Sequence, residues 1–290
     1  MFLCYNTPMK LKKLFKIFSV ILLLAVIVLS VYILLQKPSN DRDWNDDQKV
    51  LAFAERDGNL VTVHNIRNFN YRDVDDFDVN YYDKTFDLDK IKTLDYVVEP
   101  FSKFRGLAHT FLSFGFENEK GEMDYIAISV EIRKEKGESF SPWRGLLNQF
   151  ELMYVVADEN DAIKLRTHYR KDDVYLYPIN TFTEKKQLLF WDMLDRANTL
   201  KDNPEFYNTI WSTCTTNILD HINKIRQEKI TKWDYRIFFP GYSDKIAYDV
   251  ELLDTDLPFD EARQKFKIND LAEGWQEGEN FSEVIRQNLK

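Results

Sequence analysis

The pattern of hydrophobic and polar positions divides the chain into one long apolar run and a longer mixed region. Residues 17–35 contain no charged side chain over nineteen consecutive positions. Such a run is long enough for a helix to cross a bilayer and too long for the apolar region of a typical signal peptide. No small-residue cleavage site follows in residues 36–40. The sequence therefore predicts an uncleaved transmembrane anchor with a cytoplasmic N-terminus and a short spacer over residues 1–40.

The mixed region, residues 41–290, is predicted to form one domain because no linker, repeat or low-complexity tract interrupts it. Alternating and β-branched runs predict strands over 59–69, 108–116, 125–133, 152–157 and 174–178. Helical spacing of apolar positions predicts helices over 43–54, 184–200, 259–266 and 281–289, and one that begins near 214. The fold class that follows is α+β, with a mainly antiparallel sheet packed by helices behind the transmembrane helix.

An aspartate-rich stretch over residues 73–95 suggests calcium at first sight. Its spacing lacks the loop glycine and the closing glutamate of a calcium-binding loop. Aromatic residues interleave with the acidic ones. We therefore interpret this stretch as an irregular but packed surface segment and expect no metal there.

Charge is distributed unevenly along the chain. Four lysines precede the apolar run and one follows it closely: Lys10, Lys12, Lys13, Lys16 and Lys37. The positive-inside rule then places the N-terminus in the cytoplasm and everything after residue 40 outside. Residues 1–40 hold five lysines and no acid, which leaves 34 basic against 48 acidic residues, a net charge of −14. Such an acidic domain is not expected to bind nucleic acid, so the anchor is what holds it at the membrane.

Cys214 is the one cysteine that follows the anchor, in a compartment that oxidises thiols. A single thiol there is either well buried or kept for its reactivity. Ser212, Thr213 and Thr215 are good N-cap residues, and apolar positions from Ile218 onward keep helical spacing. Cys214 is thus predicted at or just inside the first turn of a helix. Unpaired N–H groups and the helix dipole favour a thiolate at that position.

A cysteine nucleophile also needs a base, and the chain has four histidines. His221 follows Cys214 by two turns of the same helix, roughly 10 Å along its axis, and is excluded. His168 lies in a charged stretch that we expect to be solvated, and His64, on a predicted strand, remains possible. His109 begins an otherwise apolar strand and is the best candidate base. The alternative is a core histidine that bonds to a backbone carbonyl.

Glu131 is the best candidate for a carboxylate that orients His109. The two residues lie on adjacent predicted strands of a hairpin and can project to the same side. The alternative for Glu131 is a salt bridge to Arg133 or Arg105. Donors for an oxyanion remain open among the backbone N–H of Cys214 and the side chains of Asn208, Ser212 and Thr213. No phosphate-binding loop, zinc-ligand pair or nucleophilic-serine motif is present, so neither a cofactor nor a metal is expected.

Several separate blocks of this sequence resemble the Lnb N-terminal periplasmic domain family and follow in the same order. They lie at residues 108–116, 129–133, 174–178, 206–217 and 240–244. The resemblance covers most of residues 41–290. It implies a circularly permuted, papain-like fold of the NlpC type, in which the histidine strand precedes the cysteine helix. It also implies a single-pass protein of the bacterial inner membrane whose C-terminal domain lies in the periplasm.

The namesake of this family is a lipoprotein N-acyltransferase that carries the fatty acyl chain on its own cysteine. By resemblance, Cys214 would be the nucleophile, His109 the base and Glu131 a possible third member. The namesake has further membrane spans after the domain, whereas this sequence shows no second apolar run. The implied substrates are a phospholipid and a lipoprotein or, alternatively, a peptide or amide of the cell wall. A non-catalytic envelope scaffold with a buried Cys214 is the third interpretation.

Overall fold

The computed structural model describes residues 8–289, which fall into two units. The first unit, which reaches to Pro38, contains the helix α1 (Pro8–Leu35). Its segment Leu11–Leu35 is long and apolar enough to cross a membrane, as the uncharged run predicts. The predicted cytoplasmic N-terminus begins in residues 1–7, which lie outside the described residues. The second unit begins at Ser39 and holds the rest of the described chain.

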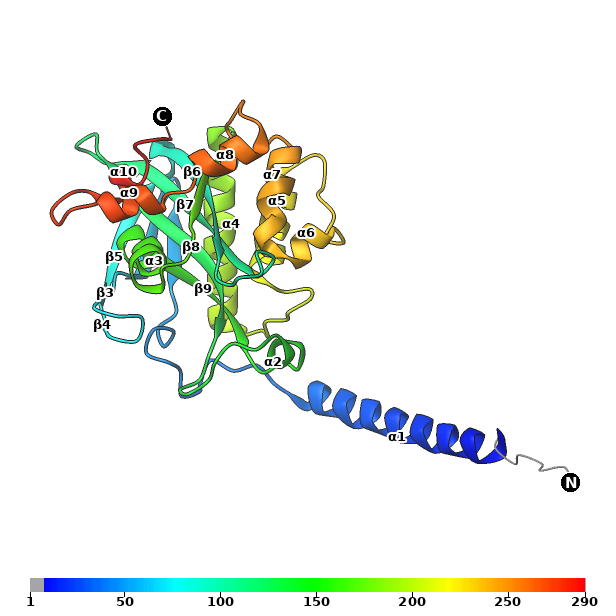
Figure 1. The fold of residues 1–290 in the computed structure, drawn as a ribbon. Coiled ribbons are helices and arrows are strands. Elements are labelled where there is room, and N and C mark those ends of the chain that lie inside the picture. The colour runs from blue at the N-terminus through cyan, green and yellow to red at the C-terminus, as the bar shows by residue number, and fades with distance from the viewer. Residues whose placement is uncertain (1–7, 290) are drawn as a thin grey trace, which may run out of the picture. The chain divides into compact units, whose positions relative to one another are not determined.

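The second unit is built on a mainly antiparallel sheet, which has eight strands among the described residues (Figure 1). The strand order is β1-β2-β9-β8-β7-β6-β10, and β5 also pairs with β2. One pair, β2 with β9, is parallel. The strands are β1 (Phe53–Asp57), β2 (Leu60–Arg67), β5 (Tyr81–Asp87), β6 (Ile91–Pro100), β7 (Ala108–Glu117), β8 (Met123–Arg133), β9 (Glu151–Asp158) and β10 (Tyr175–Pro178). A separate two-stranded ribbon joins β3 (Asn70–Tyr71) to β4 (Phe77–Asp78).

Helices cover both faces of this sheet. One face packs against α4 (Thr183–Asp202) and α5 (Cys214–Ile225), and the other packs against α3 (Glu159–Lys164), α9 (Asn269–Gly274) and α10 (Phe281–Val284). The remaining helices are α2 (Pro142–Leu146), α6 (Tyr235–Phe238), α7 (Ser243–Asp249) and α8 (Phe259–Lys265), with short turns η1 (Leu88–Lys90), η2 (Leu165–Arg170) and η3 (Pro240–Tyr242). The α+β class, with a mainly antiparallel sheet packed by helices, is confirmed.

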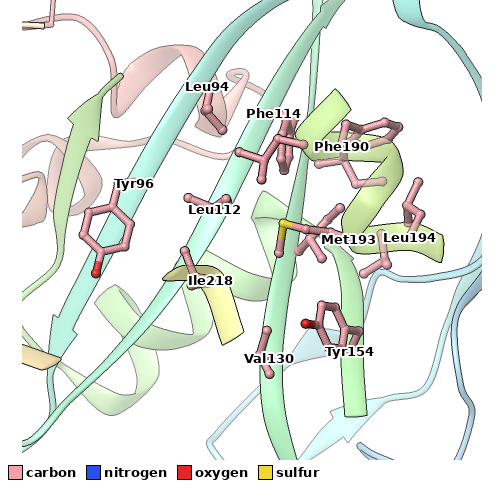
Figure 2. Packing of buried hydrophobic residues seen from close by; sticks show 14 of the residues in the cluster. Leu94, Tyr96, Leu112, Phe114, Val130, Tyr154, Phe190, Met193, Leu194 and Ile218 are labelled. Atoms are coloured by element: carbon pink, nitrogen blue, oxygen red, sulfur yellow. The ribbon is translucent and has the colours of Figure 1, made fainter. Parts of the chain in front are cut away.

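The larger core cluster fills the space between the sheet and the helices α4 and α5. Side chains of one parity along β6 and β7 enter this core, because successive strand residues point to opposite faces. Figure 2 shows Leu112 and Phe114 of β7 opposite Phe190 and Met193 of α4, with Ile218 of α5 beside them. The ring of Phe190 lies edge-on to Phe114, with ring centroids 5.1 Å apart.

The predicted hairpin at residues 108–133 is confirmed as β7 and β8. Phe111 lies opposite Ser129 and Ser113 lies opposite Ala127 in the antiparallel register. The odd-numbered residues of both strands therefore share one face of the sheet. This register is what allows a side chain at position 109 to meet one at position 131.

The helix predicted over residues 43–54 is wrong. Trp44 instead forms an isolated bridge with Glu135, and β1 begins at residue 53. The guanidinium of Arg133 donates to the carbonyl oxygens of Gln48 at 2.9 Å and Lys49 at 2.7 Å. In a helix these two carbonyls would accept backbone N–H groups four residues later. Here the side chain of Arg133, on β8, donates to them instead.

The irregular segment predicted over residues 73–95 is wrong in its second half, where β5 and the start of β6 lie. β6 is flanked by β7 and β10, although it carries two buried carboxylates, Asp95 and Glu99. Arg286 lies 2.8 Å from Asp95, and Arg166 forms an ion pair with Glu99. Acidic residues in a strand between two neighbours are thus tolerated because arginines distant in sequence neutralise them.

Phe190→Ala should lower the free energy of unfolding by about 3–5 kcal/mol, because this fully buried ring leaves a cavity against the sheet. The measurement is denaturant unfolding of the purified chain followed by tryptophan fluorescence. Leu188→Ala on the same helix is the matched control. Its side chain is 55% exposed, so its effect should stay within about 0.5 kcal/mol. Equal losses for the two variants would contradict the packing described.

Candidate active site

The helix α5 begins at Cys214, as the N-cap residues predict. Thr213 is the N-cap, and its hydroxyl accepts the backbone N–H of Thr216 at 3.2 Å. The Thr216 hydroxyl in turn accepts the backbone N–H of Thr213 at 2.7 Å. This reciprocal capping box holds the first turn in place. Cys214 is therefore the first helical residue, with a side chain that is 7% exposed in the core between α5 and the sheet.

His109 and Glu131 meet at the ends of β7 and β8 through Ser129. The His109 Nε2 atom lies 2.6 Å from the Ser129 hydroxyl and 3.1 Å from Glu131 Oε1. Ser129 donates its own hydroxyl proton to Glu131 at 2.7 Å. A hydroxyl that donates to the carboxylate accepts from the imidazole, so Nε2 carries a proton. The other ring nitrogen, Nδ1, is then the one that remains for Cys214.

The Cys214 thiol and the His109 imidazole interact electrostatically, and each shifts the pKa of the other. Burial raises the pKa of Cys214, but the interaction with His109 and hydrogen bonding from Thr110 lower that pKa below its ordinary value. Burial lowers the pKa of His109, whereas the charges of Glu131 and Cys214 raise it to about 10. Both shifts favour a thiolate beside an imidazolium near neutral pH.

Arg166 contacts the same carboxylate oxygen of Glu131, and its guanidinium lies 3.2 Å from Oε1. Burial raises the pKa of Glu131, but the charge of His109, its hydrogen bond and Arg166 hold that pKa well below the usual range. The salt bridges to Arg133 or Arg105 considered from the sequence do not form. Arg133 bonds to backbone carbonyls, and Arg105 pairs with Asp244 at 3.0 Å.

Sequence reasoning missed Ser129 and Arg166 as partners of the candidate triad. Arg166 belongs to the stretch that we expected to be solvated, yet it is buried and lies 4.7 Å from the ring centroid of Phe111. No local signal identifies Arg166, since its partners lie on β6 and β8. Ser129 could have been found, because it precedes Glu131 by two positions and therefore shares its face of the strand.

The other three histidines are engaged elsewhere. His221 bonds to Asp192 at 2.6 Å through Nδ1 and to the Tyr154 hydroxyl at 2.7 Å through Nε2. His64 bonds to the side chain of an aspartate on β5, and His168 bonds to the hydroxyl of the residue before it. Of the four histidines, His109 is thus the one whose ring interacts with Cys214.

The side chains considered as oxyanion donors act as hydrogen-bond acceptors within their own segment. The Thr213 hydroxyl caps α5, and the Ser212 hydroxyl accepts a side-chain amide from α5 at 3.2 Å. The side-chain amide oxygen of Asn208 accepts two backbone N–H groups of its own loop. The backbone N–H groups of Cys214 and Thr215 lie in the first turn, where no intrahelical acceptor exists. Backbone donors are thus available beside the sulfur.

A cavity of about 350 Å³ runs along α5 from Thr215, the residue after Cys214, and Cys214 and His109 are not among its lining residues. Thr215 and Tyr96 line the end near the sulfur, and the Thr215 hydroxyl lies 3.0 Å from that of Thr110. Most of the wall is aliphatic and includes Leu94, Leu112, Leu189, Ile218, Ile222 and Ile225. Ligand pockets in proteins measure about 300–1,000 Å³ and are mostly apolar, so this cavity has the size and the character of a binding site.

Comparison with known proteins identifies the family. The family model of the Lnb N-terminal periplasmic domain matches residues 77–241, which is more than half of the chain and includes Cys214, His109 and Glu131. A search of curated proteins and a search of solved structures each found no match. A periplasmic domain agrees with an apolar helix that can anchor the chain in a membrane. The chain therefore belongs to the Lnb N-terminal periplasmic domain family, and it is a membrane protein with a periplasmic domain.

Proposed function

We propose that this protein is a membrane-anchored, periplasmic, cysteine-dependent acyltransferase or hydrolase that acts through a thioester. One observation carries the proposal. Cys214 has a lowered pKa at the first turn of α5, and the main cause that lowers it is His109, which Glu131 holds through Ser129. A nucleophile within hydrogen-bond reach of a base that a third group orients is the signature of covalent acyl transfer.

The proposed reaction begins when the Cys214 thiolate attacks the carbonyl carbon of an ester or amide. The carbonyl oxygen becomes an oxyanion, and the backbone N–H groups at the start of α5 stabilise it. His109 donates its Nδ1 proton to the leaving alcohol or amine as the bond to the carbonyl carbon breaks. The product is a thioester on Cys214. Glu131 stabilises the imidazolium before this transfer and keeps the ring in its orientation.

In the second half of the reaction, an amine or a water molecule enters beside the thioester. The neutral His109 accepts its proton while it attacks the carbonyl carbon, and Cys214 leaves as the thiolate. An amine acceptor makes the enzyme a transferase, whereas water makes it a hydrolase. The imidazolium and thiolate pair is restored at the end of the cycle.

The cavity beside Cys214 favours a fatty acyl group over a peptide. Its aliphatic wall starts at the residue after the nucleophile and continues along α5, which suits a hydrocarbon chain. We infer that a phospholipid supplies the acyl group and that a lipoprotein N-terminus accepts it, as in the namesake of the family. A cell-wall peptide or amide would leave this cavity unused. The helix α1 is long and apolar enough to anchor the chain in a membrane that holds phospholipid.

We also infer a circularly permuted, papain-like architecture of the NlpC type for residues 41–290. The strand with His109 precedes the helix with Cys214 in the chain, and α5 packs its N-terminal turn against β7. Residues 1–40 then serve as anchor and spacer in the bacterial inner membrane. These inferences rest on the order of the elements and on the family.

His109→Ala should slow alkylation of Cys214 by iodoacetamide at pH 7. The variant removes the imidazolium charge while the Cys214 thiol stays buried. The pKa of the thiol therefore rises and the thiolate fraction falls. A rise of one pKa unit lowers the rate about tenfold. The measurement is the rate of label incorporation into the peptide that contains Cys214, over a series of pH values.

His168→Ala is the matched control for this experiment, because its ring bonds outside the site. It should leave both the rate and its dependence on pH unchanged. Equal alkylation rates in wild type and His109→Ala would remove His109 from the site.

Protein purified from membranes, or incubated with phospholipid, should carry a hydroxylamine-labile mass on the peptide that contains Cys214. A thioester is cleaved by hydroxylamine, so mass spectrometry before and after treatment detects it. A long-chain fatty acyl mass supports lipid acyl transfer, and a peptide fragment supports cell-wall cleavage instead. Cys214→Ala should carry no such adduct.

If neither substrate class yields an adduct and Cys214→Ala cells keep every envelope phenotype of the wild type, the scaffold interpretation replaces the enzyme.

A further inference from the structure

A group of exposed apolar side chains lies near the point where the chain enters the second unit. We call it the tether-side aromatic surface, and it consists of Phe140, Trp143, Ile210 and Trp211. Trp143 is 75% exposed and Trp211 is 63% exposed. Large exposed apolar groups that gather on one side of a domain mark an interaction site.

Hydrogen bonds connect this surface to the first residue of the second unit. The backbone N–H of Ser39 donates to the Glu151 carboxylate at 3.1 Å, and Glu151 forms a backbone bridge with Phe206. From there the chain continues to Thr209, whose hydroxyl donates to the carbonyl of Pro142 at 2.8 Å. The start of the second unit, the helix α2 and the loop before α5 are therefore neighbours.

The loop that carries Ile210 and Trp211 is held in a fixed conformation. The side-chain amide oxygen of Asn208 accepts the backbone N–H of Ile210 at 2.9 Å and that of Trp211 at 3.4 Å. Asn208 and Ser212 also pair across the loop through their backbones. Because this turn is closed by its own bonds, the two apolar side chains are presented to solvent without an ordering step on binding.

The chain itself limits how far this surface can lie from a membrane. α1 ends at Leu35 and the second unit begins at Ser39, so the connection spans at most about 14 Å when fully extended. With α1 across a bilayer, Ser39 stays close to the lipid headgroups. Tryptophan favours that interface, where its apolar ring and its N–H group are both accommodated.

We propose that the tether-side aromatic surface docks onto the surface of the phospholipid bilayer in which α1 is anchored. Trp143 and Trp211 insert their rings at the level of the headgroups. Cys214 follows Trp211 by three residues, so docking brings the start of α5 to the lipid. The proposal stands on exposure and chain length and does not depend on catalysis by Cys214.

The tryptophans of this chain allow a direct test. All six belong to the second unit and none to α1: Trp44, Trp143, Trp191, Trp211, Trp233 and Trp275. Quenching of their fluorescence by lipid therefore reports contact between the second unit and the bilayer. The full chain is reconstituted into phosphatidylcholine vesicles whose acyl chains carry bromine close to the headgroup, and its emission is compared with that in unbrominated vesicles.

We expect brominated lipid to quench the wild-type protein, and Trp143→Phe and Trp211→Phe each to lose a large part of the quenched emission. Trp233→Phe is the matched control, because Trp233 is 82% exposed in the segment between α5 and α6. This control should retain the full quenched component. Cys214→Ala should behave like wild type, so the outcome is separate from that of the thioester experiment.

Two results would overturn the proposal. Absence of quenching in the wild type would mean that the surface does not meet lipid and is open to a protein partner. Loss of quenching in Trp233→Phe alone would mean that a different face of the second unit docks. Unfolding curves of the variants that match wild type ensure that the changes in quenching report position and not misfolding.

Discussion

The rest of this structure depends on one constraint. Each of two carboxylates buried in the sheet has to pair with an arginine from outside the sheet. Asp95 and Glu99 lie on β6. Arg286, just after α10, pairs with Asp95, and Arg166, just after α3, pairs with Glu99. Removal of one partner from such a pair costs about 3–5 kcal/mol, because it leaves a charge buried without compensation. Arg166 therefore has to lie against the sheet. Because Arg166 belongs to η2, this pairing holds η2 against β6.

The same guanidinium extends this constraint to the candidate active site. Arg166 contacts Glu131, Glu131 holds His109 through Ser129, and His109 lowers the pKa of Cys214. Charges alternate along this series, so each group stabilises the ionised form of the next. Burial alone would keep the thiol protonated, and the imidazolium reverses that tendency. The reactivity proposed for one cysteine is in this way a property of two strands, one helix and a distant arginine.

The surroundings of the thiol combine features suited to lipid chemistry at a membrane. On one side an aliphatic cavity follows α5 away from the sulfur. The loop before Cys214 carries an exposed indole near the start of the second unit. A hydrocarbon chain taken from a bilayer needs both a short path and an apolar destination, since its exposure to water is costly. The capping box at Thr213 fixes the sulfur of Cys214 at the start of α5.

The sequence by itself determined the features that depend on neighbouring residues. The apolar run, the start of α5 at Cys214 and the hairpin that aligns His109 with Glu131 follow from spacing, capping and alternation. Only the tertiary structure decided the features whose partners are distant in the chain. It placed the charged strand β6 between β7 and β10, and it engaged the carbonyls of residues 48 and 49 with Arg133 in place of a helix. It also brought Arg166 to Glu131, because pairing of a buried charge depends on proximity in space, which local sequence patterns do not encode.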